Sequence, residues 1–248
     1  MARRRFFVDE IQQGRARIVG EEAHHLSRVL RVERGQKYEI SDNHAVWLAE
    51  VEDARKDLVS FTLIEPVAAA EPPVRVTLCA ALVRFERFED LIEKTTELGV
   101  ERIIPVLAER SEKGLELAAE KRMARWRRVA REASEQSRRV RLPELCLPQR
   151  LSQALTRPAA CRLFLDEAAT NPILATLPGM RSALDEVAVL VGPEGGWTDR
   201  ERTTITSAGW IAVSLGPAIL KTDTAAMSAL AIITAAWLVG QISNLRAD

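Results

Sequence analysis

Cysteine and histidine are scarce in this 248-residue chain, and neither is placed to cross-link it. Its three cysteines, Cys79, Cys146 and Cys161, are far apart, odd in number and form no CxxC pair. Its three histidines show no spacing typical of metal ligands. We therefore expect neither disulfides nor a metal site, and the cysteine usage is typical of a cytoplasmic protein.

Net charge is also lacking, because 35 Lys and Arg balance 35 Asp and Glu. Any binding of nucleic acid must therefore come from local patches. Residues 1–37 hold nine basic and five acidic side chains, and residues 120–141 hold nine basic and three acidic ones. One such cluster is typical of a solvated helix face, but two in a neutral chain are as compatible with a polyanionic partner.

We expect no signal peptide, because MARRRFFVDE turns acidic after three apolar residues. Residues 224–245 carry no charge and could nearly span a bilayer. Hydroxyl residues, Gln241 and Asn244 interrupt this stretch, and it follows directly on a loop. We therefore expect a buried helix, at a subunit interface or in the core, and no association with a membrane.

Residues 1–65 are rich in short segments that are typical of strands. The segments are RRFFV, ARIV, KYEIS, AVWLAEVED and LVSFTLIE. SDNHA at 41–45 is typical of a hairpin turn, and HHLSRVLRV at 24–32 has a short helical pattern. These features predict a small β-rich domain, which ends at a proline-rich linker over 67–74.

After the linker, strand and helix patterns alternate, which predicts an α/β domain over about 74–248. Helical patterns cover 84–100 and 120–137. CRLFLDE, VAVLVG and IAVSLG are short apolar strands of the kind found in parallel sheets covered on both faces. Thr198 and Glu201 form a capping box that should start one helix, and Thr224 is placed to cap the last one.

Two glycine-containing loops follow consecutive apolar strands, GPEGGWTDRE at 192–201 and GPAILKTDTA at 216–225. Ligands of open α/β sheets bind outside the carboxyl ends of the strands, so the two loops could share one site. Neither loop matches a phosphate-binding motif, and Glu194 would repel a polyphosphate. The apolar residues 217–220 should pack against the core or against a ligand such as an adenine ring. A tight strand-to-helix turn is the alternative for the first loop.

The paired loops resemble the signature of RsmE-type 16S ribosomal RNA (uracil-N3) methyltransferases, which belong to the SPOUT class. RFERFEDLIEKTTELGV, IIPVLAERS and RWRRVAREASEQSRRVRLP resemble further blocks of that family in the same order. HHLSRVLRVERGQ resembles its N-terminal RNA-binding domain. The resemblance therefore covers nearly the whole chain.

The resemblance implies an N-terminal PUA-like β-barrel over 1–70 and a SPOUT α/β domain over 74–248, with a parallel sheet and a C-terminal trefoil knot at about 187–230. It also implies a cytoplasmic homodimer that uses S-adenosylmethionine and no metal. The substrate would be a uridine in the decoding region of 16S ribosomal RNA, in the small ribosomal subunit. Another RNA, or an RNA-binding homologue with impaired catalysis, is the alternative.

The resemblance also assigns the site residues. The cofactor would lie against Leu165, Asp166, Glu167, Gly192, Pro193, Glu194, Gly195, Gly196, Leu215, Gly216, Ile219, Leu220, Thr224 and Ala225. RNA would contact Arg3, Arg4, Arg5, His25, Arg28, Arg31, Arg84, Arg87, Arg138 and Arg139. Glu194 could instead be a turn residue that pairs with an arginine, and His24 and His25 could have only surface or packing roles.

The chain departs from the family's pattern in the second loop, where the usual motif is similar to LGxRILRxETA. Ala218 and Lys221 stand where relatives have arginines, and Asp223 stands in place of glutamate. Lysine keeps the charge but loses the planar fork of arginine. The catalytic candidates are therefore Lys221, Asp223 and Arg138, because a base or a cation is needed to help uracil N3 lose its proton.

Overall fold

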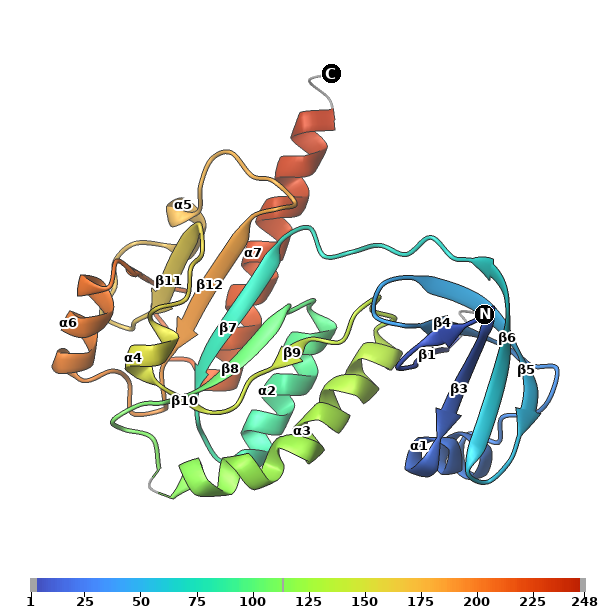
Figure 1. Cartoon of the computed structure of the whole chain (residues 1–248). Helices are drawn as coiled ribbons and strands as arrows, with labels where there is room; N and C mark the ends of the chain where they lie inside the picture. Colours follow the sequence, from blue (N-terminus) through green and yellow to red (C-terminus); the bar gives the residue numbers. More distant parts are fainter. Residues whose placement is uncertain (1–3, 113, 246–248) are drawn as a thin grey trace. The chain divides into compact units, whose positions relative to one another are not determined.

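The structure is a computed structural model that describes residues 4–112 and 114–245, with side chains described as far as residue 240. The chain divides into two compact units, each with its own sheet (Figure 1). The first unit comprises Met1–Glu71 and Ser134–Leu142, and the second comprises Pro72–Ala133 and Pro143–Asp248. The boundaries predicted from the sequence follow chain order, so they did not separate Ser134–Leu142 from the second domain.

The first unit is built on a six-stranded sheet in the order β1-β4-β5-β6-β3-β2. Its strands are β1 (Arg5–Phe7), β2 (Ile11–Gln12), β3 (Arg15–Val19), β4 (Lys37–Ser41), β5 (Val46–Ala54) and β6 (Leu58–Pro66). In β3, Ala16 and Ile18 are buried while their neighbours are exposed, as expected for a strand with one face on the core. All five predicted strands are present, and β2 was too short to be predicted.

A short helical segment packs on this sheet. It consists of α1 (Gly20–His24) and a π-helical turn, η1 (His25–Val29), so it begins four residues before the predicted 24–32. Ala23 and Leu26 face the core of the unit, whereas His24 and His25 are exposed. Asp42 Oδ1 accepts hydrogen bonds from the backbone N–H groups of His44 and Ala45, which confirms the predicted turn between β4 and β5.

Hydrogen bonds around a buried ion pair hold Ser134–Leu142 against the strands of the first unit. Arg5 donates Nη2 to Glu39 Oε2 at 2.8 Å, and both side chains are almost fully buried. Arg138 Nη2 lies 2.9 Å from Glu39 Oε1, and Arg5 Nη1 donates to the Arg138 carbonyl at 2.6 Å. Ser41 Oγ also donates to the Val140 carbonyl at 2.5 Å. Hydrogen bonds between charged groups are the strong kind, so this segment belongs firmly to the unit.

The second unit is built on a seven-stranded sheet in which every pairing is parallel, as predicted. Its order is β10-β8-β7-β12-β11-β13, with β9 paired to β8. The strands are β7 (Arg75–Ala81), β8 (Arg102–Leu107), β9 (Glu144–Leu145), β10 (Gln149–Arg150), β11 (Cys161–Leu165), β12 (Glu186–Val191) and β13 (Ile211–Val213).

Helices cover both faces of this sheet (Figure 1). The helices are α2 (Phe85–Glu97), α3 (Leu115–Gln136), α4 (Leu151–Ala154), α5 (Ile173–Thr176), α6 (Asp199–Ser207) and α7 (Thr222–Leu245). Val187, Val189 and Val191 pack with α2, α3 and α7, whereas Ala188 and Leu190 pack with α4 and α6. Successive residues of a strand point to opposite faces, so a wholly apolar run is what two covered faces require.

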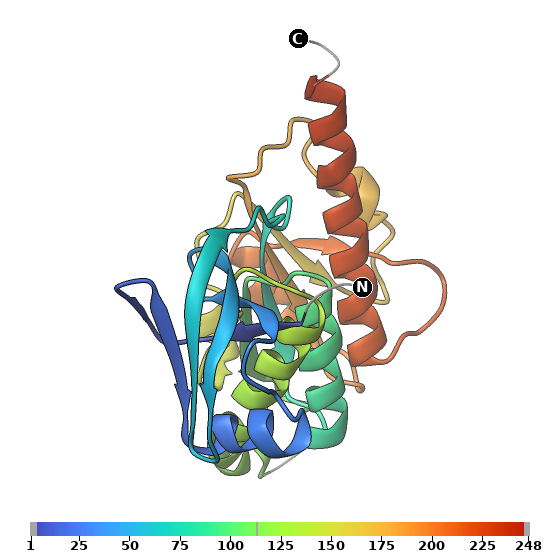
Figure 2. The ribbon, with the colours of Figure 1, turned by 90° about the vertical axis from the view of Figure 1, so that its right-hand side faces the viewer.

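The last helix, α7, packs along β7, β12 and α2 (Figure 2). Its inner face includes Leu230, Ile233 and Trp237, which are fully buried. Thr222–Gly240 is long and apolar enough to cross a membrane by composition, with a mean hydropathy of 1.5, but 39% of it is buried in the unit. The predicted helix is therefore confirmed as a core helix with one exposed face. The predicted cap is wrong, because the helix already begins at Thr222, two residues before Thr224.

Candidate functional site

A pocket opens where β11, β12 and β13 end. The three strands are adjacent and parallel, so the loops that follow them meet at one edge of the sheet. The pocket holds about 660 Å³ of empty space, counting the part that is open to solvent. It is lined by Leu165, Asp166, Glu167, Val191, Gly192, Pro193, Glu194, Gly196, Trp197, Arg202, Val213, Ser214, Leu215, Gly216, Ala218, Ile219, Leu220, Thr222 and Ala225.

The first pocket loop, residues 192–197, is shaped by two glycines and one tryptophan. A Cβ on Gly192 would lie 3.0 Å from Cε2 of Trp197, so no larger residue fits without movement. Gly196 has a φ of 68°, in the left-handed region that favours glycine. Trp197 is buried and donates Nε1 to the Leu165 carbonyl at 3.0 Å, which ties this loop to the end of β11.

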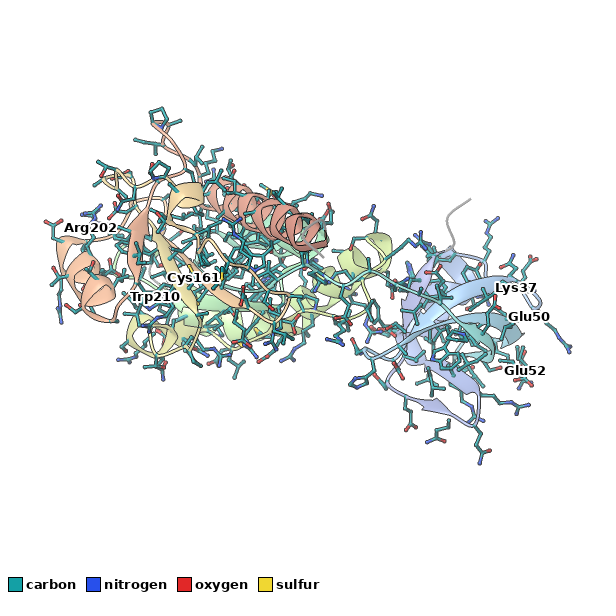
Figure 3. The ribbon with its side chains drawn as sticks, turned by 90° about the horizontal axis from the view of Figure 1, so that it is seen from above. Lys37, Glu50, Glu52, Cys161, Arg202 and Trp210 are labelled. Carbon is teal, nitrogen blue, oxygen red and sulfur yellow. The ribbon has the colours of Figure 1, made fainter. Side chains whose placement is uncertain are left out.

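A helix begins directly after this loop, as predicted. Thr198 Oγ1 accepts the backbone N–H of Glu201, and Glu201 Oε2 accepts the backbone N–H of Thr198. This reciprocal capping box fixes the start of α6 at Asp199. As a result, Arg202 is held one turn into α6 (Figure 3), and it is among the residues that line the pocket.

The second pocket loop, residues 214–221, supplies an apolar wall. Thr222 Oγ1 donates to the Gly192 carbonyl at 2.9 Å, so the two loops are joined. Ile219 is 82% exposed and lines the pocket, and Leu215 and Leu220 are half-buried. The sequence left two explanations for these apolar residues. Leu220 packs against the core of the unit, as the first explanation predicts, whereas the exposed Ile219 is free to contact an apolar part of a ligand.

Charged groups from the end of β11 and from α6 also line the pocket. Arg202 donates Nε and Nη2 to the carboxylate of Asp166, at 2.7 Å and 3.2 Å. Its Nη1 lies 3.1 Å from Asp199 Oδ1. The hydrogen bonds to Asp166 raise the pKa of the Arg202 guanidinium, which therefore stays charged. Glu167 Oε1 is farther away, at 4.0 Å from Arg202 Nη2, and its side chain is 56% exposed.

Two arginines outside the pocket lining hold the middle of the first loop. Arg87, on α2, forms an ion pair with Glu194. Arg110 donates Nη1 to the Gly195 carbonyl at 2.6 Å, and a Cβ on Gly195 would meet the Arg110 side chain. Glu194 thus lines the pocket and also pairs with an arginine, so the two interpretations of this residue are compatible. The Cα of Gly195 faces Arg110, so this residue is not part of the lining.

Most residues predicted to contact the cofactor come together in this pocket. The exceptions are Gly195 and Thr224, which lie outside the lining. The lining also contains residues that were not predicted, among them Trp197, Arg202 and Thr222. The capping box places Arg202 one turn after the loop, which is the one sequence signal that could have identified it.

The three catalytic candidates are not equivalent. Lys221 is exposed and directly precedes Thr222, which lines the pocket. Asp223 is half-buried, and its Oδ1 is buried without a hydrogen-bond partner. Arg138 belongs to the first unit, where it pairs with Glu39, and it does not line the pocket. Only the first two candidates are therefore placed beside the pocket by the structure.

The residues predicted to contact RNA fall into three groups. Arg4, His25, Arg28, Arg31 and Arg84 are exposed, and Arg87 and Arg138 are partly exposed and ion-paired. Arg5 and Arg139 are buried, at 2% and 9% exposed, and Arg139 donates Nε to the Arg141 carbonyl. These two differ from the prediction, because their guanidinium groups serve the packing of the first unit. Arg3 lies outside the described residues.

Among the residues that the structure describes, no three His, Cys, Asp or Glu side chains are grouped to hold a metal ion.

A family model described as an RNA methyltransferase domain matches residues 70–234, and one described as an RNA methyltransferase PUA domain matches residues 18–64. Ribosomal RNA small subunit methyltransferase E of Synechocystis is 32% identical over 232 residues, which cover 92% of this chain and 75% of the relative. This chain belongs to the same family of RNA methyltransferases.

Two solved structures of similar proteins agree with this assignment. A methyltransferase from Legionella pneumophila, solved with the cofactor SAM, has a TM-score of 0.87 and 29% identity, covering 95% of this chain and 98% of that one. Ribosomal RNA small subunit methyltransferase E from Neisseria gonorrhoeae, bound to S-adenosyl methionine, has a TM-score of 0.85 and 28% identity, with the same coverage. The PUA-like domain and the α/β methyltransferase domain expected from the sequence are thereby confirmed.

Proposed function

We propose that this protein uses S-adenosylmethionine to methylate ribosomal RNA, at N3 of a uridine in the decoding region of 16S RNA. The observation that carries the proposal is the pocket at the ends of β11, β12 and β13, which is lined by both apolar residues and carboxylates. Support comes from the family, whose members include small-subunit ribosomal RNA methyltransferases and SAM-bound structures.

The residues of the pocket suit an adenosine-containing cofactor. Gly192, Gly196 and Gly216 leave backbone groups open to close approach, because they carry no side chain. Ile219 and Leu220 offer an apolar surface to the adenine ring. When bound, S-adenosylmethionine supplies a methyl group that is electrophilic because it is attached to a positively charged sulfur.

The methyl acceptor determines which chemical groups the other residues at the pocket must supply. Uracil N3 is a poor nucleophile until it loses its proton, so a cation beside the uracil oxygens favours the reactive anion. We assign this role to Lys221, which is exposed and directly precedes the pocket residue Thr222, and we assign to Asp223 the role of accepting or orienting the proton. The pocket must also align N3 with the methyl group, and the uridine must be unpaired or turned out of its stack.

RNA contacts outside the pocket belong to both units. The exposed His25, Arg28 and Arg31 give the first unit a basic surface at η1, and the exposed Arg4 adds a cation just before β1. Arg84, which directly precedes α2, and Arg87, on its first turn, give the second unit two more cations. Phosphate neutralisation by such side chains supplies affinity without sequence specificity.

The proposal includes a trefoil knot over about 187–230, for which the order of the strands gives support. β13 lies at one end of the sheet, whereas α7 packs on β7 and β12 in its middle. The chain therefore turns back from the edge after residue 213 and passes the first pocket loop, where Thr222 bonds to Gly192.

The proposal also includes a cytoplasmic homodimer that does not enter a membrane, in which the exposed Leu238 and Val239 of α7 are covered by a second subunit.

The function is tested by mapping methylated nucleosides. Purified protein is incubated with labelled S-adenosylmethionine and either naked 16S RNA or small ribosomal subunits from cells that lack the gene. N3-methyluridine in a decoding-region fragment is the expected product, detected by mass spectrometry. Methylation of a different RNA would show that the enzyme acts on another substrate. Cofactor binding without methylation of any RNA would indicate that catalysis is impaired, as the alanine at position 218 suggests.

A further inference from the structure

The charges around the pocket are unevenly compensated. Among the described lining residues, Asp166, Glu167 and Glu194 carry carboxylates and Arg202 carries the guanidinium. All three nitrogens of that guanidinium are engaged, Nε and Nη2 with Asp166 and Nη1 with Asp199. The positive charge of Arg202 is therefore balanced by its own neighbours before any ligand binds.

Glu167 is the lining carboxylate with the weakest cationic partner. Asp166 has Arg202 within hydrogen-bond distance, and Glu194 has Arg87. Glu167 Oε1 lies 4.0 Å from Arg202 Nη2, at the outer limit of an ion pair. The side chain of Glu167 follows β11 and is 56% exposed, so its negative charge is available to a ligand.

The carboxylate of Glu167 lies beside the first pocket loop. A Cβ placed on Gly196 would lie 3.6 Å from Glu167 Oε1, and Gly196 itself lines the pocket. The apolar wall formed by Leu215, Ile219 and Leu220 belongs to the other loop. The wall and Glu167 line the same pocket, so the Glu167 carboxylate acts on the charge of a ligand bound there.

We propose that Glu167 makes the pocket prefer the positively charged methyl donor to the neutral product. This inference rests on the proposed function. Uracil N3 loses its proton, to Asp223 or to water that Asp223 orients, and its lone pair forms the new N–C bond. The C–S bond breaks and its electron pair stays on sulfur, so the sulfonium charge disappears. The attraction between Glu167 and the cofactor is then lost, which favours release of S-adenosylhomocysteine.

The test compares donor and product on the same variants by calorimetry. Wild type should bind S-adenosylmethionine more tightly than S-adenosylhomocysteine. Glu167→Gln should weaken binding of the donor by about five-fold, the size of an ion-pair interaction of about 1 kcal/mol at 4 Å in water. Binding of the product should change by less than about two-fold, because that ligand lacks the sulfonium charge. Glu167→Asp, which keeps the charge, should keep the preference for the donor.

Glu186→Gln is the matched control. Glu186 begins β12, at the opposite end of the strand from the pocket, and it pairs with Arg75. The Glu186→Gln substitution removes the same charge from the chain and should leave the affinities for S-adenosylmethionine and S-adenosylhomocysteine unchanged. Equal weakening of donor and product in Glu167→Gln would overturn the inference, because Glu167 would then bind a group that both ligands share, such as a ribose hydroxyl. Unchanged binding of both would overturn it as well. Failure of wild type to bind either ligand would instead refute the proposed function.

Discussion

Replacing Gly192 with alanine tests whether the first pocket loop depends on contact between its backbone and Trp197. The added Cβ would lie 3.0 Å from Cε2 and 3.1 Å from Nε1 of the indole. Trp197 is 1% exposed and donates its N–H to the Leu165 carbonyl. The ring therefore cannot move away without disturbing a buried hydrogen bond and the packing around it.

The expected cost follows from this geometry. Overpacking a closely packed site by one methyl group costs about 1–3 kcal/mol in the free energy of unfolding. For a protein of this size, each kcal/mol lowers the melting temperature by about 2–4 °C. If the loop moves instead, Gly192 and Pro193 shift in the pocket and affinity for S-adenosylmethionine falls. Differential scanning calorimetry and isothermal titration measure the two effects on the same sample.

Gly195→Ala is the control for this substitution. Its Cβ would lie 3.3 Å from Cδ of Arg110, an exposed and flexible side chain that can turn away. The loss of stability should therefore be below about 1 kcal/mol, as for most surface substitutions. A Gly192→Ala protein with normal melting temperature and normal cofactor affinity would refute the argument from close packing. So would a Gly195→Ala protein that is equally damaged.

Three further predictions concern other parts of the chain. Arg5→Met should lower the free energy of unfolding by about 3–5 kcal/mol in urea titrations, because it leaves Glu39 charged, buried and without its closest partner. Thr222→Val should weaken binding of S-adenosylmethionine and cost about 1 kcal/mol of stability, whereas Thr222→Ser should keep both, because only serine retains the hydroxyl that bonds to Gly192. Burial raises the pKa of the Cys146 thiol to about 11, so its alkylation by iodoacetamide, followed by mass spectrometry, should accelerate about ten-fold per pH unit between pH 8 and 10.

The elements that the sequence predicted well are those with strong local signals. The strands of the parallel sheet are uniform apolar runs, and such runs have few alternatives once turns bound them. The start of α6 was predicted because Thr198 and Glu201 bond within one turn of chain. The pocket loops were located by the same logic, since loops after neighbouring parallel strands must share an edge of the sheet.

The errors arise where distant parts of the chain decide the outcome. Thr224 has the residue type of a helix cap, but α7 starts at Thr222, whose hydroxyl is bound to Gly192, thirty positions away in the sequence. Arg5 stands in a run of arginines that is typical of a flexible basic tail. Its guanidinium is nevertheless buried, because it bonds to the Glu39 carboxylate and to the Arg138 carbonyl. No local pattern reveals such partners, because they meet only in the folded chain.

The same distinction separates the location of the site from its chemistry. Glycines and apolar residues place the loops, and these are properties of a short stretch of sequence. The electrostatic character of the pocket depends on which charges are already balanced, and that depends on partners from other elements: Arg87 for Glu194, and Arg202 for Asp166. Ala218 is a further example, because it lines the pocket and supplies no positive charge there. Under the proposed function, a cation that assists the loss of the uracil proton would have to reach the pocket from its margin, and the exposed Lys221, directly before Thr222, is the catalytic candidate for that role.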